Sequence, residues 1–113
     1  MITIWHNPRC SKSRQTLALL QERNLDFVVR KYLEDTPSIE ELRAVCKKLG
    51  MRAIDVMRVK EKPFGDLELA NTDAEEILFG AMSTHPILIE RPIVIVGDKA
   101  ALGRPPEQVL TIL

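Results

Sequence analysis

The sequence has few of the features that mark membrane or secreted proteins. No apolar run in its 113 residues approaches the roughly 20 residues that a helix needs to cross a bilayer. Its first residues lack the basic start and long apolar core of a signal peptide. The only two cysteines, Cys10 and Cys46, are far apart and do not make a disulfide framework. We therefore expect a protein of the reducing cytoplasm with no membrane contact.

The chain also lacks an excess of either charge. Sixteen basic residues balance sixteen acidic ones, so the formal net charge is zero. A general nucleic-acid binder is not expected from this balance, and any anion site must be built locally from clustered arginines. The two histidines and two cysteines show no metal-ligand spacing. We expect no bound metal or cofactor.

The hydrophobic pattern at the start of the chain predicts alternating strands and helices. A strand over 2–5, a helix over 13–23 and a strand over 27–32 form a βαβ unit, whose strands should be parallel. The tail predicts a strand opened by a proline, a hairpin turn, a second strand and a short helix, over 91–96, 97–99, 100–102 and 107–112.

The middle of the chain predicts helices only. Ser38 and Glu41 have capping-box spacing, with Thr36 as the alternative cap, and Gly50 ends this helix. Two further helices are expected over 53–59 and 73–83, with a break at Pro63-Phe64-Gly65. The order βαβ, helical insertion, ββα is that of the thioredoxin-like fold. We predict an α/β protein with one domain over 1–113 and a mixed four-stranded sheet between helices.

Cys10 stands where this fold places its chemistry, at the junction of the first strand and helix. The run His6-Asn7-Pro8-Arg9-Cys10-Ser11-Lys12-Ser13-Arg14 puts the cysteine at a helix N-cap. Free N–H groups, the helix dipole and nearby cations all favour thiolate over thiol. We therefore predict a reactive Cys10. Cys46, on an apolar helix stripe, is predicted to be a core residue.

Neither of two common catalytic motifs that contain a cysteine is present around Cys10. A Cys-x-x-Cys pair would need a second cysteine at Ser13, and a Cys-x5-Arg phosphatase loop would need arginine at Thr16. A single thiol at an anion-binding helix terminus remains. Arginines at element ends can reach such a site and grip an oxyanion with two hydrogen bonds, and the candidates are Arg58, Arg91 and Arg104.

Other residues near these motifs carry weaker expectations. His6 can tune the thiolate or simply end the strand, and His85 suits a helix end. The Arg91-Pro92 bond is a candidate cis peptide, because the thioredoxin-like fold places a cis proline opposite its active thiol. Pro86 and Pro105 are expected to be ordinary turn residues.

Three segments together resemble the glutaredoxin-dependent arsenate reductases. They are the run His6 to Arg14, the run His85 to Val94, and Gly103-Arg104-Pro105-Pro106-Glu107. The resemblance covers the chain from Ile2 almost to Leu113, in family order. The wording Pro-Arg-Cys-Ser-Lys-Ser-Arg and the end at Leu113 are most similar to the short YfgD-type branch.

The resemblance implies a specific activity. Cys10 would attack arsenate to form a thiol–arsenate ester, glutathione as co-substrate would displace water, and glutaredoxin would reduce the intermediate and release arsenite. Arg58, Arg91 and Arg104 match the oxyanion-binding arginines of the family. His6 and Ser13 match the residues that tune the thiolate, and Pro92 matches the cis proline.

Two other functions stay open from the sequence. One is a thiol protein that handles glutathione adducts or another oxyanion, for which arsenate is only a mimic. The other is a regulatory module similar to the Spx-like transcription regulators of the same fold, although their Cys-x-x-Cys switch is absent here.

Overall fold

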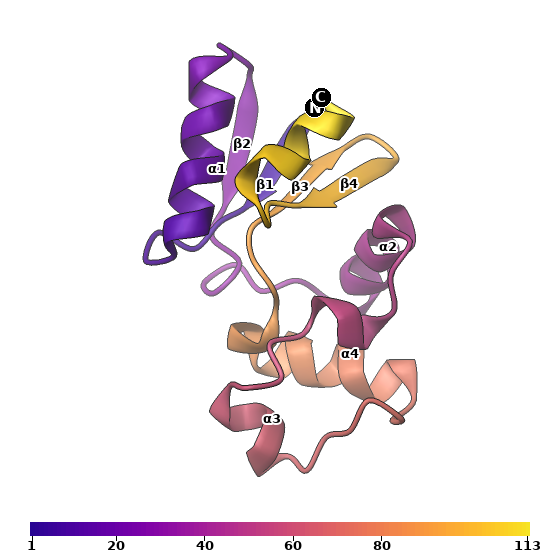
Figure 1. Cartoon of the computed structure of the whole chain (residues 1–113). Coiled ribbons are helices and arrows are strands. Elements are labelled where there is room, and N and C mark those ends of the chain that lie inside the picture. Colours follow the sequence, from indigo (N-terminus) through magenta and orange to yellow (C-terminus); the bar gives the residue numbers. More distant parts are fainter. The chain divides into compact units, whose positions relative to one another are not determined.

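The computed structural model describes residues 1–113, which form two compact units (Figure 1). Unit 1 comprises Met1–Asp35 and Arg91–Leu113, and unit 2 comprises Thr36–Glu90. Unit 2 is therefore one continuous insertion between the two halves of unit 1. None of the helices combines the length and the apolar character needed to cross a membrane.

A mixed four-stranded sheet forms the centre of unit 1. Its strands are β1 (Ile2–Trp5), β2 (Phe27–Arg30), β3 (Ile93–Val96) and β4 (Lys99–Leu102), in the spatial order β2-β1-β3-β4. Strand β1 pairs parallel with β2 and antiparallel with β3, and β3 pairs antiparallel with β4. The predicted thioredoxin-like arrangement of the sheet is confirmed.

The core of unit 1 lies on the face of the sheet covered by α1 (Ser11–Glu22) and the C-terminal 3₁₀ helix η3 (Pro106–Ile112). Ile4, Val94 and Ala101 stand side by side in the register of β1, β3 and β4. Leu20 of α1 and Val109 of η3 pack against this row, and both are fully buried. This packing fixes the position of α1 relative to the strand that precedes it.

Unit 2 contains helices and, apart from one isolated β-bridge between Met57 and Ile89, no β-structure. Its elements are α2 (Ile39–Leu49), the 3₁₀ helix η1 (Ala53–Val56), α3 (Lys62–Asp66), α4 (Glu75–Thr84) and the 3₁₀ helix η2 (Pro86–Leu88). Helices α2 and α4 pack together, and buried side chains come from both. Cys46 is one of them, and its burial, with the nearby Glu75 and Asp55 charges, raises the pKa of its thiol to about 11. The prediction of a core residue is confirmed.

The ends of α2 follow the predicted signals. The Ser38 hydroxyl accepts the N–H of Glu41, and the Glu41 carboxylate accepts the N–H of Ser38, each over 3.1 Å. Gly50 ends the helix in the left-handed region at φ 67°. Ser38 is therefore the N-cap, and the alternative cap at Thr36 is wrong.

Other boundaries differ from the expected ones. Pro63-Phe64-Gly65 does not break the chain but lies inside α3, where a proline in the first turn lacks only an N–H that needs no helical partner. The segments near 53 and 107 wind as 3₁₀ helices, and β2 stops at Arg30, two residues early. His85 ends α4, as predicted.

Replacement of Ser38 by alanine should lower the free energy of unfolding by about 1 kcal/mol, because the Glu41 N–H loses its acceptor. Urea titration followed by helical circular dichroism measures this loss. Thr36→Ala is the matched control and should change the midpoint little. Equal losses in the two variants would contradict the assignment of the cap.

Candidate active site

Three strand ends of unit 1 meet at one end of the sheet. Trp5, the last residue of β1, pairs with Ile93, the first residue of β3, and Ile93 pairs with Leu102 at the end of β4. The residues that follow Trp5, precede Ile93 and follow Leu102 must therefore lie close together. These are the loop that leads to Cys10, the Arg91-Pro92 step and the Gly103-Arg104 step.

Cys10 is the N-cap of α1, and only 7% of its surface is exposed. Its side chain makes no capping hydrogen bond of ordinary geometry, but the backbone N–H groups of Ser13 and Lys12 face the sulfur. Burial is the largest influence and raises the pKa of the thiol. The Ser13 N–H, the Arg91 charge, the Lys12 N–H and the Arg104 charge outweigh it together, so the pKa of Cys10 lies below its ordinary value.

Arg104 is the cation in direct contact with the sulfur. Its Nη2 lies 3.8 Å from Cys10 Sγ, and its Nε donates a hydrogen bond of 2.8 Å to the Arg91 carbonyl oxygen. The hydrogen bond to the Arg91 carbonyl oxygen holds the Arg104 guanidinium beside Arg91. Both arginines lower the pKa of Cys10. The structure thus brings together Cys10, Arg91 and Arg104, which are far apart in the sequence.

The basic side chains beside Cys10 in the sequence are not among the charges that lower its pKa. Arg9, Lys12 and Arg14 are exposed, and Arg14 donates a hydrogen bond of 3.0 Å to the Pro8 carbonyl oxygen. The positive charges that stabilise the thiolate come from the distant arginines instead. Nearness in the chain does not decide which charges act on the sulfur, because their electrostatic effect depends on distance and burial in space.

His6 is connected to Cys10 through Ser13. The His6 ring is 5% exposed, and its Nδ1 lies 2.6 Å from the Ser13 hydroxyl, which also accepts the N–H of Asn7 over 3.0 Å. Burial, followed by the Lys31 and Arg14 charges, lowers the pKa of His6 and favours the neutral ring. The Ser13 hydroxyl can then donate its proton to Nδ1. A role of His6 in tuning the thiolate stays a prediction, and it would act by holding Ser13.

Pro92 follows a cis peptide bond, as predicted. The Arg104-Pro105 bond is cis as well, so the expectation that Pro105 is an ordinary turn residue is wrong. Two cis bonds therefore follow the two arginines of the site.

Gly103 is a functional position that the sequence reasoning passed over. A Cβ on this residue would lie 2.5 Å from the Thr16 hydroxyl and 2.6 Å from Cγ of Pro92. Its N–H also donates to the Pro92 carbonyl oxygen over 2.9 Å. Only glycine fits between these two buried side chains, and the backbone can then carry Arg104 toward the sulfur. A glycine directly before a candidate arginine was the available signal.

Arg58 belongs to unit 2 and lies just after η1, which ends at Val56. Its Nη1 lies 3.1 Å from the Glu61 carboxylate and 3.5 Å from the Ile87 carbonyl oxygen. Its guanidinium is thus already paired within its own unit. A role of Arg58 at the oxyanion site stays a prediction.

The chemistry available to unit 1 is that of a stabilised nucleophile beside two guanidinium groups. A thiolate can attack an electrophilic centre, and the arginines can hold the oxygen atoms of an anion there. The structure contains no group of three or more histidine, cysteine or acidic side chains placed to hold a metal ion.

Comparisons with known proteins agree on one family. The model of the ArsC family matches residues 5–112. Relatives that are 49% identical over 99% of this chain include an arsenate reductase of Haemophilus influenzae and the uncharacterized protein YfgD of Escherichia coli, of which 98% and 96% are covered. A solved arsenate reductase from Vibrio cholerae, 49% identical, superposes with a TM-score of 0.95 over 99% of this chain and 97% of its own.

The pH at which Cys10 ionises should depend on Arg104 and not on Arg9. Arg104→Met removes a charge that stabilises the thiolate, so the pKa of Cys10 should rise. Alkylation of the thiol, which speeds up as pH rises through that pKa and then levels off, should shift to higher pH. Arg9→Met is the control. An equal shift in the control would contradict the assignment of the activating charge.

Alanine at position 103 should destabilise unit 1 by about 1–3 kcal/mol, because its Cβ overlaps Thr16 and Pro92. Urea unfolding followed by the fluorescence of Trp5, the single tryptophan, measures the change. Gly65→Ala is the control, since a Cβ there meets no atom within 4 Å. A Gly103→Ala protein as stable as wild type would show that the close packing is unimportant.

Proposed function

Because this chain belongs to the ArsC family, we propose that it is an arsenate reductase that works through the single nucleophile Cys10. The observation that carries the proposal is the Arg104 guanidinium, 3.8 Å from a nearly buried sulfur whose pKa is lowered. The relatives at 49% identity that bear the name arsenate reductase support the choice of substrate.

Attack on arsenate requires that two negative groups approach each other. Arsenate is a dianion at neutral pH and the nucleophile is an anion. Two unit charges about 4 Å apart interact by about 4 kcal/mol at an effective dielectric constant of 20. Arg91 and Arg104 offset this repulsion, and their guanidinium groups suit two-oxygen contact with the anion.

In the first step, Cys10 Sγ forms a bond to arsenic and one arsenate oxygen leaves as hydroxide, which takes up a proton to become water. The product is a thiol–arsenate ester, with arsenic still in its higher oxidation state. The arginines hold the remaining oxygen atoms in the same place before and after the bond forms.

The second thiol comes from outside the chain. Reduction to arsenite gives arsenic two electrons, and these come from two thiols that end as a disulfide. Cys46 is a poor candidate because it is buried in unit 2 and its pKa is raised to about 11. Glutathione therefore enters as co-substrate, and its thiol displaces water from the ester to form a sulfur–arsenic bond. A glutaredoxin thiolate then attacks the glutathione sulfur, that sulfur–arsenic bond breaks and leaves its two electrons on arsenic, and glutathione and glutaredoxin depart as a mixed disulfide. Hydrolysis of the remaining Cys10–arsenic bond releases arsenite and restores the thiol.

Arg58 is the third oxyanion-binding arginine of the proposal, carried over from the family resemblance. Since it pairs with Glu61, contact with an oxyanion would replace or share that ion pair. The proposal needs no bound metal or cofactor. It places the protein in the cytoplasm, where glutathione is kept reduced.

Purified protein should oxidise NADPH in the presence of arsenate when it is coupled to glutathione, glutaredoxin and glutathione reductase. Cys10→Ser should lose roughly 1,000-fold or more of this activity, because the nucleophile is removed. Cys46→Ala is the control and should keep most of it.

The outcomes separate the candidate functions. No arsenate turnover above the level of Cys10→Ser would overturn the proposal. Rapid glutathionylation of Cys10 without arsenate turnover would instead favour a protein that handles glutathione adducts or another oxyanion.

A further inference from the structure

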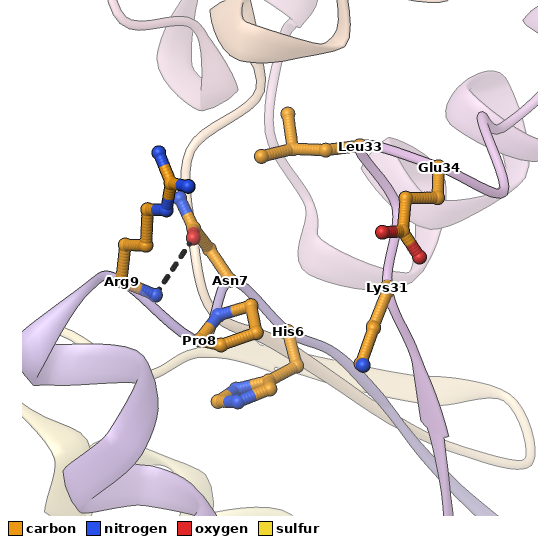
Figure 2. A pocket seen from close by; sticks show the side chains of 7 residues that line it. All are labelled: His6, Asn7, Pro8, Arg9, Lys31, Leu33 and Glu34. Atoms are coloured by element: carbon orange, nitrogen blue, oxygen red, sulfur yellow. Dashed lines mark hydrogen bonds between the residues drawn. The ribbon is translucent and has the colours of Figure 1, made fainter.

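A pocket of about 250 Å³ lies in unit 1, and the proposed mechanism assigns no ligand to it. Figure 2 shows its lining residues, which come from the loop after β1 and the turn after β2: His6, Asn7, Pro8, Arg9, Lys31, Leu33 and Glu34. Small-molecule pockets usually measure about 300–1,000 Å³. This one is therefore suited to one end of a small ligand.

The wall that carries Lys31 and Glu34 is held in place by backbone bonds. The Lys31 carbonyl oxygen accepts the N–H groups of Glu34 and Asp35, over 2.9 Å and 2.8 Å. Arg30 forms an ion pair of 3.3 Å with Asp35, and Tyr32 inside the turn is fully buried. The two charged side chains thus project from a turn of defined shape.

The opposite wall is tied to the helix that carries the nucleophile. The Asn7 side chain accepts the N–H of Arg9 over 3.0 Å, and the N–H of Asn7 donates to the Ser13 hydroxyl. Arg9 is the residue directly before Cys10, and consecutive Cα atoms are about 3.8 Å apart. The lining of the pocket thus includes the residue that directly precedes Cys10 and is joined by hydrogen bonds to the first turn of α1.

The pocket carries charges of both signs. Arg9 and Lys31 are cations and Glu34 is an anion (Figure 2). All three residues are exposed. An oxyanion alone would be attracted by the first two and repelled by the third. A zwitterion, with a carboxylate and an ammonium group on one carbon, matches both signs. Leu33 and Pro8 provide apolar contact for a short methylene chain.

We infer that this pocket binds the γ-glutamyl end of glutathione and directs the cysteinyl thiol toward Cys10. Lys31 pairs with the carboxylate of that end and Glu34 with its ammonium group. The inference rests on the proposed function only in that glutathione is the co-substrate, and it adds the subsite that recognises it.

Thiol–disulfide exchange tests the subsite without arsenate. The Cys10 thiolate attacks one sulfur of oxidised glutathione, the S–S bond breaks, and one glutathione leaves as thiolate while the other stays on Cys10. The rate is compared with that for 2-hydroxyethyl disulfide, which is neutral and has no γ-glutamyl group. A change in the reactivity of the Cys10 sulfur alters both rates alike and therefore cancels in their ratio.

Lys31→Met should lower this ratio by about threefold to fivefold, as expected for the loss of an exposed ion pair. Lys99→Met, which removes an exposed lysine of the same unit outside the pocket, is the matched control and should leave the ratio nearly unchanged. Glu34→Gln should also lower the ratio, since the ammonium group loses its partner. General electrostatics predicts the opposite sign, because removal of a negative charge favours an anionic disulfide.

A higher ratio in Glu34→Gln, or an effect of Lys31→Met no larger than that of Lys99→Met, would overturn the subsite. Wild-type protein with no preference for oxidised glutathione would do the same. The expected pattern in a protein without arsenate turnover would support the subsite and count only against the proposed arsenate reduction.

Discussion

The sulfur of Cys10 lies in a place that water barely reaches, yet its pKa is lowered, and the packing of unit 1 positions the groups that lower it. Burial alone would keep the thiol protonated. The N–H groups at the start of α1 and the charges of Arg91 and Arg104 outweigh burial and lower the pKa of the thiol below its ordinary value. Each of these groups is positioned by packing elsewhere. The helix is held by Leu20 against the sheet, and Arg104 is brought in by the narrow contact of Gly103 with Thr16 and Pro92.

The sheet topology explains why residues from both ends of the chain share one site. Because β3 runs antiparallel to both β1 and β4, the end of β1, the start of β3 and the end of β4 coincide. The parallel partner β2 ends beside β1, and the turn that follows it forms the far wall of the charged pocket. The arginines that face the sulfur and the residues proposed to recognise glutathione thus come from different strands. An oxyanion and a thiol co-substrate can then approach Cys10 by separate contacts.

Much of the fold, and the place of Cys10 in it, could be predicted from residues whose structural effect is local. The capping pair Ser38 and Glu41, the left-handed Gly50 and the N-cap position of Cys10 depend on interactions within a few residues, and all are present. Predictions failed where local signals compete. The sequence predicts a break at Pro63 because proline disfavours helix interiors, yet the residue fits the first turn of α3. The cis bond at Pro105 and the tight packing at Gly103 depend on neighbours that the sequence does not name.

By itself the sequence determined the order of strands and helices, the place of Cys10 at the first strand–helix junction and the absence of a second cysteine beside it. These properties follow from residue type, periodicity and spacing. The tertiary structure decided which cations lower the pKa of the thiol, that His6 contacts the Ser13 hydroxyl, and that the loop before Cys10 lines a pocket of mixed charge. Electrostatic influence depends on distance and burial in space. The exposed Arg9 beside Cys10 in the chain is therefore not among the charges that lower its pKa, whereas Arg104, from the far end of the chain, contacts the sulfur.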